Sequence, residues 1–213
     1  HNVHHAYPVG NSFTVLNRGK SLGTFNKKDI SREELLSMMA GGEELDKFDV
    51  VVVGGGHAGV EAAYVVYRSG LSCALVTFEK SKIGQMSCNP AIGGLGKSHI
   101  VREIDAMGGI MPIATGMSGI QYRTLNTRKG DAVQALRVQC DRDLYKKAIQ
   151  KILNSTSINI FEEEVEDLIV EQESVKGVIT KNKKIYGKKT ILTTGTFLNG
   201  LMYTGSEVSS GGR

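Results

Sequence analysis

Two glycine-rich stretches contain the residue types that bind phosphate groups. The first, GGGHAG, runs from Gly54 to Gly59 and has the spacing Gly-x-Gly-x-x-Gly. The second, AIGGLGKSH, runs from Ala91 to His99 and contains Gly-Lys-Ser, as the phosphate-binding loop of nucleotide hydrolases does. The two patterns predict different nucleotides, so the elements on either side must decide between them.

The first cluster lies between a predicted strand and a predicted helix. FDVVVV at 48–53 is a continuous apolar run, which is typical of a strand buried on both faces. CALVTF at 73–78 supplies a second strand, so the stretch predicts a βαβ unit with parallel strands. The helix between them ends at Gly70 and has its apolar face at Val60, Ala63, Tyr64 and Tyr67.

In this setting each glycine of the first cluster has its own role. Gly54 permits the tight turn, Gly56 lets a pyrophosphate approach the backbone, and Gly59 lets helix and strand pack closely. The amide groups and the dipole at the helix start then stabilise the phosphate charge. We therefore expect a dinucleotide cofactor at Gly54, Gly55, Gly56, His57, Ala58 and Gly59.

The position expected to bind the ribose hydroxyls departs from the usual pattern. An acidic residue commonly closes the second strand of such a unit, but here the residue is Thr77. Glu79 follows two residues later, on the same face of the strand. We expect either the Thr77 hydroxyl or the Glu79 carboxylate to bond to the ribose.

The second cluster lacks the setting of a phosphate-binding loop. The preceding KSKIGQMSCNP is polar and predicts a loop, and no Asp at the end of a downstream apolar strand is available to bind magnesium. We expect a glycine-rich loop lying against the cofactor; a tight structural turn and a nucleotide hydrolase are the alternatives. The residues that would make these contacts are Gly93, Gly94, Gly96, Lys97 and His99.

The remainder of the chain predicts two helices and a run of short strands. Residues 99–109 predict a helix ending at Gly108, and residues 141–153 predict a second with Asp141 near its start. The apolar face of the second would hold Leu144, Ala148, Ile149 and Ile152. VEDLIVE, VKGVIT, KIYG and TILTTG then predict a β-meander followed by a return strand.

Residues 1–46 predict a small ending distinct from the rest. FTVL and SLGTF flank Asn17 to Lys20 and predict a hairpin, and SREELLSMMAGG predicts a helix with a Ser31–Glu34 capping box that ends at Gly41. HNVHHAYPVGNSFTVLNRGKSLG resembles the C-terminal tail of sugar-importing ABC-transporter ATPases, with His1 at their switch histidine. That resemblance implies a relic without ATPase activity; a generic N-terminal extension is the alternative.

Composition is that of an ordinary globular protein. Hydrophobic residues make up 40% of 213 residues and charged residues 23%, and no apolar run reaches the roughly 18–20 residues of a membrane helix. The three cysteines suit neither a metal knuckle nor a disulfide framework, which favours the cytoplasm. The chain starts with His, so we expect it to be part of a longer protein.

One segment of the chain is clearly basic. Residues 121–147 contain seven Lys or Arg residues against three Asp residues, a local charge of +4 (7 − 3). With Tyr122 and Tyr145 interleaved, the segment could contact the phosphates of a nucleic acid; cofactor phosphates, internal ion pairs and a solvated face are the alternatives.

Four longer motifs resemble one family. GQMSCNPAIGGLGKSHIVREIDAMGG, GIQYRTLN, KGDAVQALRVQCDRDLY and TTGTFLNG together are similar to the GidA/MnmG family over residues 47–213. The resemblance implies an α/β fold: an incomplete Rossmann-like FAD-binding domain of the two-dinucleotide-binding flavoprotein type, with a parallel sheet and a β-meander. Thr77 fits this family, whereas Asp131 stands where the family usually has Pro.

The resemblance also implies site residues and partners. FAD would lie on Gly54 to Gly59, Val165 would contact its adenine end, and the backbone at Gly195 would pass near it. Cys88 would be an active-site thiol, whereas Cys73 and Cys140 are expected to be packing residues. The family uses NADH and a folate to modify the wobble uridine of tRNA, as a homodimer with a GTPase partner. Segments needed for turnover come after Arg213 in the family, so we expect weak FAD binding and no tRNA modification by this piece; a non-catalytic chimera is the alternative.

Overall fold

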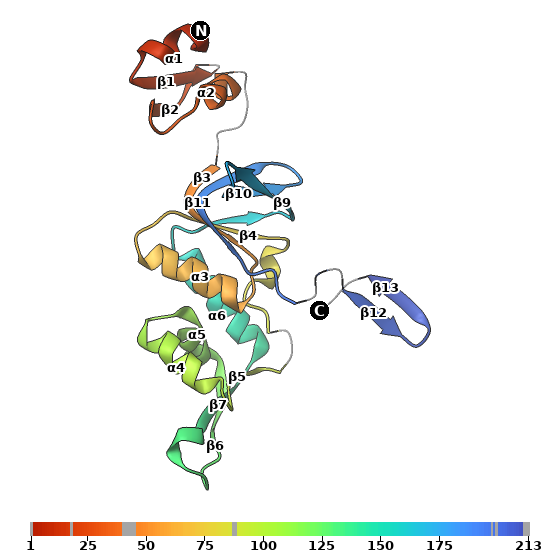
Figure 1. The fold of residues 1–213 in the computed structure, drawn as a ribbon. Coiled ribbons are helices and arrows are strands. Elements are labelled where there is room, and N and C mark those ends of the chain that lie inside the picture. Colours follow the sequence, from red (N-terminus) through yellow and green to blue (C-terminus); the bar gives the residue numbers. More distant parts are fainter. Residues whose placement is uncertain are drawn as a thin grey trace. The chain divides into compact units, whose positions relative to one another are not determined.

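The structure consists of two compact units, His1–Asp46 and Lys47–Arg213 (Figure 1). Each unit has its own hydrophobic core. The computed structural model describes residues 2–17, 19–39, 46–86, 89–196, 198 and 200–210.

The first unit is a hairpin packed with two helices. Its elements are α1 (Val3–Val9), β1 (Ser12–Asn17), β2 (Lys20–Asn26) and α2 (Arg32–Met39). β1 and β2 pair in antiparallel fashion, which confirms the predicted hairpin. The capping box is also confirmed, because the Ser31 amide donates to the Glu34 carboxylate and the Glu34 amide donates to the Ser31 hydroxyl. Helix α1 was not predicted, and Gly41 lies outside the described residues.

A six-stranded sheet forms the centre of the second unit. Its strands are ordered β8-β4-β3-β11-β10-β9. β3, β4 and β8 are parallel neighbours, whereas β9, β10 and β11 form an antiparallel meander, and both arrangements confirm the α/β prediction. The bounds are β3 (Asp46–Val53), β4 (Cys73–Thr77), β8 (Asn159–Glu162), β9 (Val165–Glu171), β10 (Ser174–Thr180) and β11 (Lys184–Leu192).

Both faces of the parallel strands are buried. Val50 and Val52 point to one face and pack with α3 (His57–Arg68) and α6 (Arg142–Asn154). Val51 and Val53 point to the other face and pack with residues of the meander such as Val178. Helix α3 crosses one side of the sheet in Figure 1. The continuous apolar run of β3 follows from this arrangement, since each side chain meets a core.

A smaller antiparallel sheet and two helices complete the main body of this unit. The sheet has the order β5-β7-β6, from β5 (Ala91–Gly93), β7 (Ala135–Cys140) and β6 (Gly119–Leu125). The helices are α4 (Ser98–Ala106) and α5 (Ile110–Ser118). Two 3-10 turns, η1 (Lys80–Lys82) and η2 (Asp131–Val133), and a hairpin of β12 (Leu201–Thr204) and β13 (Glu207–Ser210) are the remaining elements described.

Three predictions about elements were incomplete or wrong. KIYG and TILTTG do not form separate strands, because both contribute to the continuous β11. Leu144 is 50% exposed, and the buried face of α6 holds Tyr145, Ala148, Ile149 and Leu153 instead. Helix α5 was missed because its apolar residues surround Pro112 and Gly116 rather than following one clear stripe. Within the described residues, no helix is long and apolar enough to cross a membrane.

Helix α5 begins at a residue without a side chain, and α3 supplies the missing cap. Gly109 is the N-cap and offers no side-chain acceptor. The Glu61 carboxylate of α3 instead accepts hydrogen bonds from the amides of Ile110, at 3.1 Å, and Met111, at 2.6 Å. A carboxylate there also complements the positive end of the helix dipole. Glu61 therefore joins α3 to α5.

Candidate functional site

The turn from β3 into α3 can be built only from glycine at two positions. Gly54 has φ +109°, and a Cβ on it would lie 2.3 Å from the carbonyl oxygen of Thr193. A Cβ on Gly59 would lie 1.8 Å from the carbonyl oxygen of Gly54. These distances are far below van der Waals contact, so the turn is drawn tightly against both the helix and the end of β11.

Gly56 differs from its neighbours because it faces open space. Nothing lies within 4 Å of the position that its Cβ would occupy, and its φ of −73° is one that any residue adopts. Packing and conformation therefore do not require glycine here. Because glycine has no side chain, the space above the backbone at this position stays open.

The start of α3 offers hydrogen-bond donors to that space. Gly56 is the N-cap of α3 and makes no side-chain cap hydrogen bond. The first amides of a helix have no acceptor within the helix, and the dipole adds positive charge there. Uncapped helix amides beside a glycine that faces open space form a site that a pyrophosphate group can occupy.

The two polar residues expected to bind the ribose, at and beyond the end of β4, differ in whether their side chains are free of other partners. Thr77 is buried at 5% exposure, and a Cβ on Gly55 would lie 2.9 Å from its hydroxyl. Glu79 lies beyond the strand, where it accepts a hydrogen bond from Ser81 and forms a 2.8 Å ion pair with Lys82. The Lys82 and Ser81 contacts hold the pKa of the Glu79 carboxyl below its ordinary value. The expectation that Glu79 shares a strand face with Thr77 was wrong, because β4 ends at Thr77.

Two further predicted positions belong to segments that meet the same edge of the sheet. The Thr193 amide donates to the Val53 carbonyl at 2.9 Å, which brings the segment containing Gly195 beside the turn. Gly195 itself has φ +77° and open space around its Cβ position. Glu163, two residues before Val165, donates its amide to the Thr77 carbonyl at 2.9 Å. Val165 itself packs half-buried against the core on the meander side of the sheet.

Beneath the turn lies a buried pair of aromatic rings that sequence reasoning did not connect. The His57 ring stacks on Tyr145 of α6 with 5.5 Å between centroids. His57 Nε2 and the Tyr145 hydroxyl are buried, with no hydrogen-bond partner among the described residues. Burial lowers the pKa of His57 and raises that of Tyr145. Both side chains are therefore held neutral at pH 7.

Tyr145 cannot take part in the nucleic-acid contact that was one interpretation of the basic segment 121–147. Its side chain is 0% exposed, in the core between α3 and α6. A nucleic acid on the surface cannot reach it. Tyr122, in contrast, is 57% exposed on β6.

The second glycine cluster does not form a nucleotide-hydrolase loop. The short strand before it, β5, pairs in antiparallel fashion with β7 and lies outside the parallel sheet. Gly93 has φ +83°, and its Cβ would lie 2.3 Å from the Leu136 carbonyl oxygen, so it serves close packing against β7. Gly94 and Gly96 have open space at their Cβ positions, and Lys97 and His99 are exposed. A phosphate-binding loop requires a parallel strand at this point.

The cysteines divide into two groups. Cys73 and Cys140 are free thiols that are buried, which confirms that they pack. Burial raises the pKa of Cys73 to about 11, so this thiol is not activated. Cys88 lies outside the described residues.

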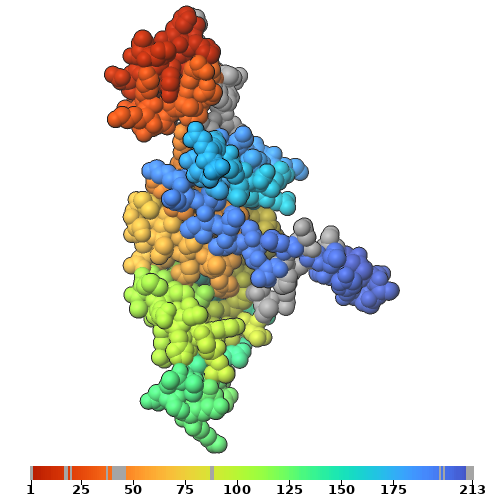
Figure 2. Space-filling model, in the orientation of Figure 1, coloured from red at the N-terminus to blue at the C-terminus, as the bar shows by residue number. Residues whose placement is uncertain are grey.

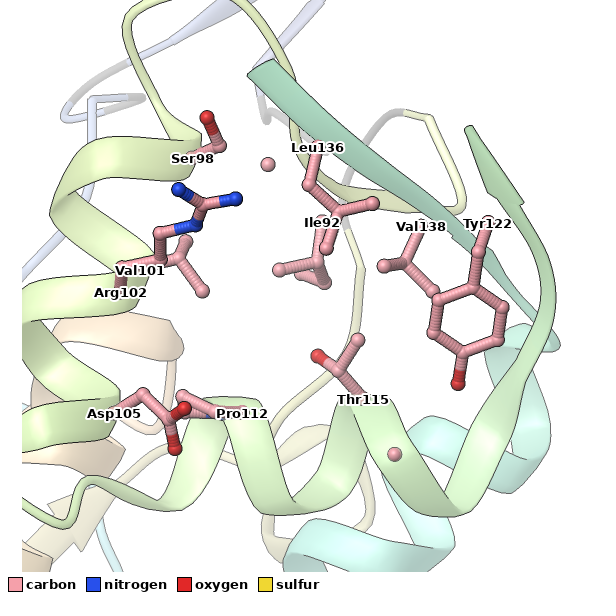
Figure 3. Close-up of a pocket in the computed structure, with 12 residues that line it drawn as sticks. Ile92, Ser98, Val101, Arg102, Asp105, Pro112, Thr115, Tyr122, Leu136 and Val138 are labelled. Carbon is pink, nitrogen blue, oxygen red and sulfur yellow. The ribbon is translucent and has the colours of Figure 1, made fainter. Parts of the chain in front are cut away.

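A cavity of about 200 Å³ lies between α4, α5 and the small sheet (Figure 3). Its walls are mainly apolar, and the Arg102 side chain points into it. None of its lining residues belongs to the turn at Gly54–Gly59, so the two features are separate. The lining consists of Ile92, Gly93, Ser98, Val101, Arg102, Asp105, Pro112, Thr115, Gly116, Tyr122, Leu136 and Val138.

Solved structures with a related fold include two crystal forms of GidA from Aquifex aeolicus. The form I structure is 49% identical with a TM-score of 0.76, and the match covers 79% of this chain and 28% of that one. The form II structure is 48% identical with a TM-score of 0.74, covering 76% and 27%. The present chain therefore spans just over a quarter of the length of the Aquifex protein.

A more distant structure shares the fold alone. The GidA-related protein from Thermus thermophilus is 18% identical with a TM-score of 0.53, and the match covers 76% of this chain and 59% of that one. The family model described as glucose inhibited division protein A matches residues 49–213. The chain therefore belongs to the GidA family, and its fold is the Rossmann-like fold that binds FAD in that family.

Proposed function

We propose that residues 47–213 bind FAD with its pyrophosphate on the amides at the start of α3, at Gly54 to Gly59. The observation that carries this proposal is the contrast among the glycines. Gly54 and Gly59 are required by packing, whereas Gly56 faces open space beside amides that no side chain caps. This contrast indicates that glycine stands at position 56 to leave space for a ligand.

We assign supporting roles to three further residues. Thr77, next to Gly55, would bond to the ribose, since the Glu79 carboxylate is already paired with Lys82. Gly195 would let the backbone after β11 pass near the cofactor, and Val165 would contact its adenine end. Cys88 remains a prediction from the sequence for the active-site thiol.

The reaction of the longer protein is proposed from family membership. FAD supplies the redox chemistry when bound, and this part of the chain would hold and orient it. We propose a role in forming 5-carboxymethylaminomethyluridine at the tRNA wobble position, with NADH, a GTPase partner and a homodimer in the cytoplasm. Because the chain spans 28% of the Aquifex GidA chain, we propose that it binds FAD without modifying tRNA by itself.

Flavin uptake by the purified chain tests this proposal. We expect the absorbance of bound flavin to co-elute with the protein or to appear after FAD is added. Gly56→Val should weaken FAD affinity by about tenfold or more, while its cost in stability should stay near the roughly 1 kcal/mol of a poorer N-cap residue, because its side chain enters open space. Lys97→Ala, in the exposed second cluster, is the comparison and should weaken FAD binding far less than Gly56→Val does.

Two results would contradict the proposal. One is a folded, colourless chain that takes up no added FAD. The other is loss of nucleotide binding in Lys97→Ala with retention in Gly56→Val, which would favour the hydrolase alternative. The antiparallel position of β5 already argues against that alternative.

A further inference from the structure

The cavity of Figure 3 is larger than the voids of an ordinary protein core. Its volume is about 200 Å³, and most of its wall is formed by the apolar side chains of Ile92, Val101, Pro112, Leu136 and Val138. Protein interiors are close-packed and contain few voids larger than a water molecule. Arg102 and Asp105 line the cavity and are exposed, so it opens to solvent beside α4. Figure 2 shows α4 and α5, coloured yellow-green, at the surface of the unit.

A glycine of α5 keeps this space open. Gly116 lies on the same face of the helix as Pro112 and Thr115, and all three line the cavity. Nothing lies within 4 Å of the position that its Cβ would occupy, and its φ is not in the left-handed region. Glycine within a helix costs roughly 0.5–1 kcal/mol relative to alanine. Neither packing nor conformation therefore requires glycine here, and the space that it leaves is available to a ligand.

Two polar side chains of α4 line the cavity without a partner of their own. The Arg102 side chain points into the cavity, and Ser98, one turn earlier, is only 4% exposed. Within the described residues, the guanidinium group forms no ion pair and the serine hydroxyl forms no hydrogen bond. The Thr115 hydroxyl, in contrast, donates to the Met111 carbonyl at 2.8 Å. Because buried polar groups are normally hydrogen-bonded, these free donors indicate an acceptor supplied by a ligand.

The charges around the cavity favour a carboxylate over a phosphate. A carboxylate carries one negative charge and forms two parallel hydrogen bonds with a single guanidinium group. A phosphate monoester carries about −1.5 to −2 charge at pH 7, which is more than one arginine neutralises. Asp105 lines the same cavity and would repel the excess charge.

The size of the cavity limits the rest of the ligand. Sites for drug-sized ligands have volumes of roughly 300–1,000 Å³, so a cavity of about 200 Å³ is too small for a dinucleotide. We propose that the cavity binds a small organic acid whose carboxylate pairs with Arg102 and Ser98. Its apolar body would lie against Leu136 and Val138 of the small sheet. This site is separate from the turn at Gly54–Gly59 and does not depend on the proposed function.

Binding of benzoate and hexanoate, two acids with different apolar bodies, tests the proposal. Calorimetry with the full chain should show saturable binding with a Kd of about 1 mM or lower. Benzamide, the uncharged counterpart of benzoate, should bind about tenfold more weakly, because it lacks the charge that pairs with the guanidinium group. Equal affinity for benzoate and benzamide would overturn the proposal. So would the lack of saturable binding of both acids up to about 10 mM.

A pair of arginine variants assigns the charge that binds the carboxylate. Arg102→Gln should weaken benzoate binding about tenfold and remove the preference over benzamide. Arg128→Gln removes an exposed arginine that does not line the cavity, so it is the matched control and should bind as the wild type does. Wild-type benzoate affinity in Arg102→Gln would overturn the proposal.

A variant that fills the cavity distinguishes it from the rest of the surface. Gly116→Leu places a side chain in the open space and removes a glycine from a helix, so it should abolish benzoate binding without lowering the melting temperature. Benzoate binding that persists in this variant would overturn the proposal. FAD uptake, followed separately by flavin absorbance, should be unchanged in Gly116→Leu. Displacement of benzoate by FAD would assign the cavity to the cofactor site and would also overturn the proposal.

Discussion

The hydroxyl of Thr193 lies 3.4 Å from the carbonyl oxygen of Gly54, although 139 residues separate the two in the sequence. The same hydroxyl donates to the Val53 carbonyl at 2.6 Å. The end of β11 is thereby fixed against the turn that leads into α3. The proposed cofactor site depends on this contact, because it sets the position of the turn from behind.

Substitution of Gly59 should strongly destabilise the second unit. In Gly59→Ala the new methyl group would lie 1.8 Å from a backbone oxygen, which cannot move without displacing the turn. We expect a loss of more than about 3 kcal/mol in the free energy of unfolding, measured by urea denaturation. Gly56→Ala is the control and should cost only the roughly 1 kcal/mol of a poorer N-cap residue, because open space surrounds its Cβ position. Equal losses in both variants would contradict this packing of the turn.

Substitution of Glu61 should destabilise the start of α5. Glu61→Ala removes the acceptor of two amide hydrogen bonds, and we expect a loss of about 1–2 kcal/mol in the free energy of unfolding. Glu61→Gln keeps the shape and one carbonyl acceptor, so its loss should be smaller. Hydrogen exchange at Ile110 and Met111 should accelerate in the alanine variant; unchanged exchange would show that the cap is not needed.

The buried imidazole of His57 should make stability depend on pH. Burial lowers its pKa below the ordinary 6.5, so the unfolded chain binds a proton in a range where the folded chain does not. The free energy of unfolding should therefore decrease as the pH falls below about 6.5, with a slope of at most about 1.4 kcal/mol per pH unit.

His57→Phe tests this dependence, because it keeps a ring against Tyr145 and removes the titrating group. Melting temperatures between pH 7.5 and 5 should fall less steeply for the variant than for the wild type. Asp49 does not confound the measurement, because its effect lies in a more acidic range. The hydrogen bonds from Lys188 and Ser72 lower the pKa of its carboxyl from the ordinary 3.8. Identical curves for wild type and variant would refute the assignment.

Charge reversal on the small sheet should stabilise it. Arg137→Glu would place opposite charges at a register pair that now holds two arginines. We expect a gain of about 0.2–1 kcal/mol at low salt, which added salt should reduce. Lys176→Glu on the larger sheet serves as the comparison. Destabilisation by Arg137→Glu would mean that the arginine makes contacts other than those described.

Much of the second unit could be predicted because its elements have strong local patterns. The apolar run of β3, the glycines after it and the spacing of Val60 and Ala63 are sufficient for a βαβ unit. Helix α5 and strand β6 lack such patterns, since their apolar residues meet partners from several distant elements. Leu144 was misplaced for a related reason: the buried face of α6 is rotated toward Tyr145 by packing against α3 and the sheet.

The Gly-x-Gly-x-x-Gly turn between a buried strand and a helix can be recognised in the sequence, since it depends on local conformation and periodicity. Packing of the folded chain decided which glycine faces open space and which contacts Thr193, because those contacts come from a segment far along the chain. It also decided that Tyr145 is buried and that Arg123 faces Arg137. Burial and register arise when distant segments pack together, and a local pattern does not encode which segments these will be.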